Sequence, residues 1–183
     1  MNGFGAAVLL AGGRIDGLGT LRAEPSDVSR SFVALAWAAV PLVLLRLMLW
    51  YAEAGPPRHA THLLLNELLV FSTAWLGFAV ISHRLADRLG RGALWPRFMV
   101  VYNWCNVVSC VLVLVGSIPQ AMGAPPLLAQ VCQVVVTGWS LWLAWVAIRL
   151  TLRTGPLLAI YLVLIEQAIG ISFAIAGATL MPR

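Results

Sequence analysis

Residues 156–180 read PLLAIYLVLIEQAIGISFAIAGATL, and Glu166 is the one charged residue in this apolar run. At a rise of about 1.5 Å per residue, a helix of this length crosses a hydrocarbon core of about 30 Å. Further apolar runs of similar length lie at residues 31–51, 62–82, 98–118 and 126–150. Because these runs fill most of a 183-residue chain, the sequence predicts an all-α, polytopic bundle of five transmembrane helices.

The first thirty residues precede these spans and predict a separate lead-in segment. Phe4 and Val8 recur at helical spacing, which predicts a short amphipathic helix at the membrane interface. Ser26 or Asp27 is the expected N-cap of the first span. The predicted division is a cytoplasmic lead-in at 1–30 and a transmembrane domain at 31–183.

Composition points to the membrane and away from several other classes. Hydrophobic residues make up 61% of the chain, well above the soluble range, and all 12 basic residues are arginine. The arginines form no cluster typical of nucleic-acid binding, so we expect no nucleic-acid partner. Cys105, Cys110 and Cys132 lie inside spans without metal spacing, and His62 and His83 sit at opposite ends of one span, which argues against haem. Without phosphate-loop or hydrolase motifs, we expect no cofactor, no metal and no enzymatic activity.

Arginine placement predicts the orientation of the chain. The connections after the second and fourth spans are rich in arginine, whereas residues 119–125 carry no charge. Arginine-rich loops stay on the cytoplasmic side, so the N-terminus is expected inside and the C-terminus outside a bacterial inner membrane. The residues assigned to topology and to lipid headgroups are Arg84, Arg88, Arg91, Arg97, Arg149 and Arg153, together with Arg14, Arg22 and Arg30 before the first span.

Two charged residues fall at matching depths in the first two spans. Arg46 lies about five residues from the outer end of its span, and Glu67 lies about five residues from the outer start of the next. Since unpaired charges in hydrocarbon cost several kcal/mol, a hairpin of these spans predicts an ion pair between the two side chains.

Polar side chains on one stripe of a membrane helix predict the face that points away from lipid. Asn103 and Asn106 lie on one such stripe in the third span. Gln130 and Gln133 begin a second stripe in the fourth span, which continues through Thr137, Ser140 and Ala144. We expect both stripes to face the interior of the bundle and to form hydrogen bonds between helices.

Glu166 lies about 15 Å past Pro156, near the middle of the membrane, with no basic residue of the chain at that depth. Three interpretations stay open for it. A neutral carboxyl could donate a hydrogen bond to an amide or carbonyl, since burial disfavours the charged form. The carboxyl could instead couple transport to a proton or cation, or contact a polar group of a partner subunit.

Small residues recur on the last span. Gly170, Ala174 and Ala178 follow one another at four-residue spacing, and Gly177 lies on the face of Glu166. This pattern allows helix backbones to approach closely. We expect it to pack mainly against other helices of the same chain.

The layout of residues 31–180 resembles the Yip1 class of five-span membrane proteins, as does the joint between the last two spans. That joint runs from Trp139-Ser140-Leu141-Trp142 through Arg149-Leu150-Thr151-Leu152-Arg153 into residues 156–160. The acidic, Gly- and Pro-containing motif of the eukaryotic cytoplasmic domain is missing, so the resemblance implies the topology and no trafficking role. The run Asp27-Val28-Ser29-Arg30-Ser31-Phe32 is also similar to small bacterial inner-membrane proteins and implies no activity.

The leading functional hypothesis is a non-enzymatic accessory, assembly or scaffold subunit that contacts lipid and other membrane proteins or itself. The alternative is a small oligomeric transporter or proton-coupled carrier, with Glu166, Asn106 and Gln133 lining a polar cavity. A solvated funnel reaching Glu166 would favour transport, and dry packing around it would favour the subunit. A third hypothesis, a lipid-handling protein, would need a lateral opening between helices beside Arg84, Arg88, Arg91 and Arg97.

Overall fold

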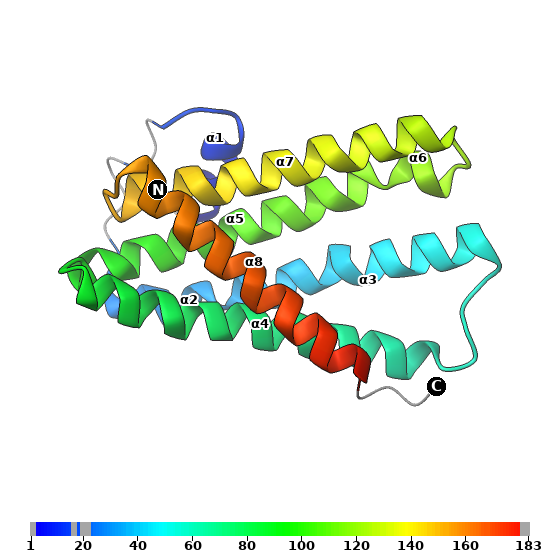
Figure 1. Cartoon of the computed structure of the whole chain (residues 1–183), viewed down its shortest axis with the longest axis horizontal. Coiled ribbons are helices and arrows are strands. Elements are labelled where there is room, and N and C mark those ends of the chain that lie inside the picture. Colours follow the sequence, from blue (N-terminus) through cyan, green and yellow to red (C-terminus); the bar gives the residue numbers. More distant parts are fainter. Residues whose placement is uncertain (1–2, 16–17, 19–22, 180–183) are drawn as a thin grey trace.

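The computed structural model describes residues 3–15, 18 and 23–179, and it contains helices and no strand in that part of the chain (Figure 1). The helices are α1 (Gly3–Ala11), α2 (Pro25–Ser31), α3 (Val33–Glu53), α4 (Ala60–Arg88), α5 (Trp95–Gly116), α6 (Ile118–Ala121), α7 (Pro126–Thr151) and α8 (Pro156–Thr179), with a 3-10 turn, η2 (Gly92–Leu94), before α5. Five helical stretches, with α2 and α3 forming one of them, are long and apolar enough to cross a membrane. The chain is therefore a multi-pass membrane protein built as an all-α bundle.

Proline marks the first turn of several spans. Pro25, Pro126 and Pro156 each open a helix, where the missing N–H costs nothing because that position has no partner within the helix. The first span begins at Pro25, ahead of the predicted start at residue 31. Its N-cap is Glu24, and Asp27 serves as the third helical residue of a capping box, so the predicted cap at Ser26 or Asp27 was wrong.

The N-terminal helix α1 is present as predicted, but its packing differs from the prediction. Ala6, Ala7 and Leu10 are buried, whereas Phe4 and Val8, the residues that suggested the helix, are exposed. The helix is apolar all round and packs against α5, where the rings of Phe4 and Trp104 meet edge-on at 5.4 Å. The amphipathic pattern therefore predicted a helix that is present but does not describe it. The helix is part of the bundle because its buried apolar residues pack against α5.

Helix α5 forms the centre of the bundle. It packs most extensively against α7, and also against α3, α1 and α2. Helix α8 joins α7 at one end, crosses the bundle diagonally, and packs along α4 (Figure 1). Although α3 and α4 are consecutive, they diverge and touch little. This divergence leaves room between α3, α4 and α8 at the end of the bundle where α3 finishes.

The α5–α7 contact depends on a glycine. A Cβ atom on Gly116 would lie 2.6 Å from Val136 Cγ1 and 2.8 Å from Val136 Cγ2, closer than atoms can approach. Val136 is β-branched and cannot easily rotate its methyl groups away. Gly138, in contrast, has no heavy atom within 4 Å of its Cβ position.

We expect Gly116→Ala to lower the free energy of unfolding by about 1–3 kcal/mol, because α5 and α7 must move apart. Gly138→Ala is the matched control and should raise it by about 0.5–1 kcal/mol, because alanine restricts the unfolded chain and favours a helix. Denaturant unfolding of both variants in the same detergent measures the difference. A Gly116→Ala protein as stable as the wild type would contradict the tight α5–α7 packing.

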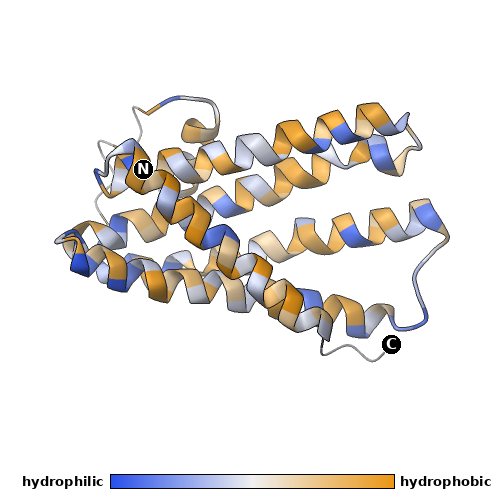
Figure 2. Ribbon diagram, viewed as in Figure 1, coloured by the Kyte–Doolittle hydropathy of each residue, from blue (hydrophilic) through white to orange (hydrophobic). Residues whose placement is uncertain are grey.

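The arginine-rich connections gather at one end of the bundle, together with α1 and α2 (Figure 2). Arg91, in the connection from α4 to α5, donates a hydrogen bond from Nη1 to Leu152 O at 2.8 Å, and Nη1 also contacts Arg153 O. This arginine therefore binds the carbonyl end of α7, where the helix dipole favours positive charge. The α3–α4 loop and α6 lie at the opposite end.

Candidate functional site

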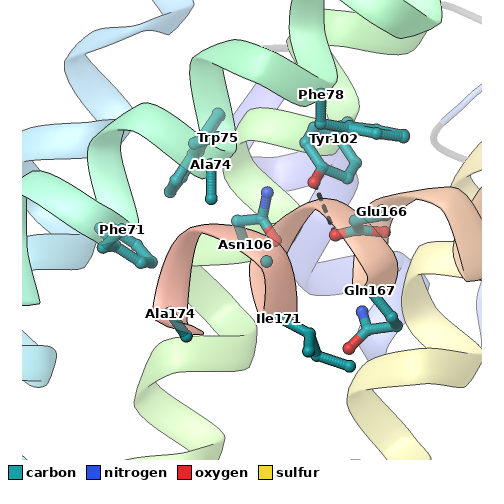
Figure 3. A pocket seen from close by; sticks show the side chains of 11 residues that line it. Phe71, Ala74, Trp75, Phe78, Tyr102, Asn106, Glu166, Gln167, Ile171 and Ala174 are labelled. Carbon is teal, nitrogen blue, oxygen red and sulfur yellow. Dashed lines mark hydrogen bonds between the residues drawn. The ribbon is translucent and has the colours of Figure 1, made fainter. Parts of the chain in front are cut away.

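Glu166 borders a pocket of about 400 Å3 between α4, α5 and α8 (Figure 3). Helix α8 crosses the space between α4 and α5 there and carries Glu166, Gln167 and Ile171 along its pocket side. Helix α5 contributes Tyr102 and Asn106. The volume falls within the range of small-molecule sites, which are concave, mostly apolar, and fixed by a few polar groups.

The two oxygens of Glu166 differ in their surroundings. Oε1 accepts a hydrogen bond of 2.6 Å from the Tyr102 hydroxyl. Oε2 is buried and has no hydrogen-bond partner among the described residues. No arginine or histidine of the described chain lines the pocket. A carboxyl oxygen in this state costs free energy until it binds a proton, a cation or a donor.

Of the polar residues predicted for the third span, only one reaches this pocket. The half-buried Asn106 lines it with Glu166. Asn103 is fully buried elsewhere: its Oδ1 accepts from Trp75 Nε1 at 2.8 Å, and its Nδ2 donates to Ser31 Oγ at 2.8 Å. Asn103 therefore joins α5 to α4 and α2, which gives it a structural role in the core.

Aromatic rings form one wall of the Glu166 pocket. Phe71 and Trp75 meet edge-on at 5.4 Å, and Trp75 and Tyr102 meet edge-on at 6.4 Å. Phe78 completes the group, with its ring 4.9 Å from that of Tyr102. Trp75, Phe78 and Tyr102 are buried, whereas Phe71 is half-buried. These rings pack around Tyr102, whose hydroxyl donates to Glu166.

A second pocket of about 510 Å3 adjoins the first and contains the predicted ion pair. Arg46 Nε donates to Glu67 Oε2 at 2.6 Å, and Nη2 donates to Oε1 at 2.7 Å, so the pair is bidentate. This confirms the prediction made from their matched depths. Ala174 lines both pockets. The two pockets therefore lie next to each other along α8, one at Glu166 and the other between the divergent ends of α3 and α4, and the two together are called the hollow.

Most of the small residues singled out on α8 line one of the two pockets and do not pack against a helix. Gly177 packs as predicted, since a Cβ there would lie 2.5 Å from Val70 Cγ2 of α4. Gly170 has no atom within 4 Å of its Cβ position and lines the Glu166 pocket. Ala174 and Ala178 are exposed and line the outer pocket. The prediction that Gly170, Ala174 and Ala178 pack against a helix was wrong, because α8 crosses α4 at an angle and leaves that face uncovered.

The predicted inner stripe of α7 is only partly inside. Gln133 donates a hydrogen bond of 2.6 Å to Ser117 Oγ, which joins α7 to the end of α5. Gln130 and Thr137 are exposed on the bundle surface, which corrects their predicted interior position. Gln133 and Gln130 line a separate pocket of about 620 Å3 near α6, so Gln133 does not join the Glu166 site.

The arginines assigned to lipid headgroups divide into two groups. Arg91 and Arg97 are half-buried and donate to backbone carbonyls, Arg91 at the end of α7 and Arg97 to Leu18 O, so they are not simple headgroup contacts. The exposed ones are Arg84, Arg88, Arg149 and Arg153, with the Arg149 guanidinium 5.1 Å from the centre of the Trp145 ring. Arg22 lies outside the described residues.

Sequence reasoning missed two residues that shape the site. Tyr102 lies four residues before Asn106 and so shares its helical face, which is a signal that the sequence contains. Trp75 takes part through α4, and its role depends on how α4 lies beside α5, which no spacing in the sequence gives.

No group of three or more His, Cys, Asp or Glu side chains in the described part of the chain could hold a metal ion. No family model matches the chain, and no curated protein and no solved structure shows significant similarity to it.

Proposed function

We propose that this chain is a small, non-enzymatic membrane carrier that exchanges a ligand for protons, and that Glu166 is its central binding group. One observation carries the proposal. A buried carboxyl oxygen with no hydrogen-bond partner among the described residues borders a pocket, and a second pocket that shares Ala174 with the first lies beside it. Ionisable groups inside membrane spans typically mark ion or substrate pathways.

The arrangement suits exchange between a proton and a ligand. Tyr102 holds Oε1 in place, so Oε2 is left as the atom that gains or loses a partner. A proton neutralises the carboxyl when no ligand is bound, and a bound ligand replaces that proton. Without ligand, the carboxyl takes up a proton on one side of the membrane and releases it on the other, so the empty carrier conducts protons down their gradient. Alternating occupancy of one site by two species is the simplest physical basis for coupled transport.

The proposed setting is a bacterial inner membrane with the N-terminus in the cytoplasm and the C-terminus outside, as the Yip1-like layout implies. Support comes from the gathering of the arginine-rich connections at one end of the bundle. The outer pocket with Arg46 and Glu67 then opens toward the exterior. Ligand would enter from that side and reach Glu166 past Ala174.

Proton entry into proteoliposomes tests the proposal. The purified protein is reconstituted into vesicles that contain a fluorescent pH indicator, and a potassium gradient with valinomycin makes the interior negative. We expect faster acidification of the interior than in protein-free vesicles of the same lipid. Equal rates in the two preparations would overturn the proton-coupled carrier.

A second candidate function, an accessory or assembly subunit, is favoured by the surface of α7. Gln130 and Thr137 are exposed within a membrane span, where polar side chains are usually covered by another helix. A partner helix on this face would cover both side chains. Such a partner, or a second copy of the chain, would meet α7 on the face that carries these two side chains.

Native mass spectrometry of the protein extracted from its own membrane in mild detergent tests this candidate. A defined heteromeric mass that is lost in a Gln130→Leu/Thr137→Val variant would support an accessory subunit. A monomer, or a homo-oligomer unaffected by these substitutions, would contradict it. The outcome is independent of proton entry, so the two functions can be separated.

A further inference from the structure

We infer that the Glu166 pocket binds a small organic cation that carries an aromatic or alkyl group. This inference rests on the proposed function, because it names the ligand class of the same site. Two features of the pocket act together: a carboxyl with an unpaired oxygen, and a wall of four aromatic rings.

The charge of the pocket selects a cation. Glu166 is the one ionisable carboxyl in the lining, and the lining holds no arginine or histidine to neutralise it. The Arg46 side chain nearby is already bound by both oxygens of Glu67, so it is not available to Glu166. A positively charged ligand would therefore supply the missing partner of Oε2, whereas an anion would meet an uncompensated carboxylate.

The aromatic wall selects an organic cation over a metal ion. The rings of Phe71, Trp75, Phe78 and Tyr102 line the pocket beside Glu166 (Figure 3). Aromatic rings attract ammonium groups through their quadrupole and pack well against apolar substituents. A bare metal ion would instead need several oxygen ligands, and among the described side chains that line this pocket, Glu166 supplies the one carboxyl, beside the oxygens of Tyr102, Asn106 and Gln167.

The size of the pocket sets the scale of the ligand. About 400 Å3 accommodates a single-ring organic cation with room for the side chains to adjust. The outer pocket shares Ala174 with it, and this side chain is small and exposed. In the proposed carrier, the ligand would pass from the outer pocket to Glu166 along this face of α8.

Isothermal titration calorimetry of the purified protein in an uncharged detergent tests the inference. The probe is benzyltrimethylammonium, and phenylmethanesulfonate is its anionic counterpart of similar size. We expect saturable binding of the ammonium compound and none of the sulfonate. Absence of saturable ammonium binding, or equal binding of both compounds, would overturn the inference.

Variants assign the binding to this pocket. Glu166→Gln should weaken binding at least about tenfold, because the neutral amide lacks the charge that the cation requires. Phe71→Leu removes one ring at nearly constant volume and should weaken it by about three- to tenfold. Glu53→Gln, the same chemical change on an exposed residue at the end of α3, is the matched control and should bind like the wild type.

These results separate the ligand class from the carrier function. Ammonium binding unchanged by both Glu166→Gln and Phe71→Leu would overturn the assignment to this pocket. If the ammonium compound fails to bind while proton entry exceeds that of protein-free vesicles, the ligand class is wrong and the carrier stands. If it binds in a Glu166-dependent way while proton entry stays at the protein-free rate, the binding site stands and the carrier is wrong. Should Glu166→Gln fail to fold, Phe71→Leu and the sulfonate comparison still decide the inference.

Discussion

Replacing Glu166 by glutamine is expected to reduce proton entry into proteoliposomes to the rate of protein-free vesicles. Glutamine keeps the size of the side chain and can still accept the hydrogen bond from Tyr102, but it cannot take up or release a proton at neutral pH. If the carboxyl is the one proton-carrying group along the hollow at this depth, its loss removes the pathway. Proton entry is followed by the fluorescence of the entrapped pH indicator at equal protein density.

Two companion variants make this prediction specific. Glu166→Asp retains a carboxyl on a shorter side chain and should restore a measurable part of the flux. Glu53→Gln changes an exposed carboxyl in the same way and should leave the flux unchanged. Thermal unfolding in detergent confirms that each variant is folded. Wild-type flux in a folded Glu166→Gln protein would remove Glu166 from the pathway.

The second large effect is expected at the ion pair between α3 and α4. Glu67→Leu leaves Arg46 without its bidentate partner, and we expect the free energy of unfolding to fall by about 1–2 kcal/mol, since the Arg46 side chain is 43% exposed in the outer pocket and keeps part of its solvation. The two helices otherwise touch little, so the pair is a main link between their outer halves. Denaturant unfolding in mixed detergent measures the loss.

The double variant Arg46→Leu/Glu67→Leu is the informative control. Because it removes both charges, no uncompensated charge remains, and most of the stability should return. The single variants and the double variant form a thermodynamic cycle that isolates the coupling between the two side chains. Additive losses, with the double variant as unstable as the sum of the single ones, would show that the pair is not coupled.

The ion pair also shows what the sequence can predict. Its two members fall at equal depth in consecutive spans, so the rise per residue of a helix and the cost of an unpaired charge were sufficient to pair them. The five spans followed from hydropathy in the same way. These features depend on the depth of a residue in the membrane. For a membrane-spanning helix, that depth follows from the number of residues counted from the end of the span.

Features that depend on how helices cross were not predictable in this way. The small residues Gly170 and Ala174 indicated helix packing, yet α8 crosses α4 at an angle that leaves them facing a pocket. Gln130 and Gln133 lie three residues apart, yet one is exposed and the other is bonded to Ser117. Spacing places residues on a common face, but the neighbouring helices decide whether that face is covered. The pocket at Glu166 results from the arrangement of α4, α5 and α8 in space, which the spacing of residues along one helix does not give.

The most direct test of the account is the access of water to this hollow in the membrane. In a variant with Cys105, Cys110 and Cys132 replaced by alanine or serine, a cysteine at Ala174 reports on the junction of the two pockets. A cysteine at the neighbouring Ile175, which is 61% exposed on the bundle surface but lines neither pocket, is the matched control facing lipid. The measurement is the rate of reaction with a membrane-impermeant, charged methanethiosulfonate added from the outside.

We predict that Ala174→Cys reacts readily from the outside and that Ile175→Cys does not, because the charged reagent requires water and a thiolate. Added benzyltrimethylammonium should slow the reaction at Ala174→Cys. Equal absence of reaction at both positions would mean that the hollow is dry in the membrane, and that result would contradict the carrier.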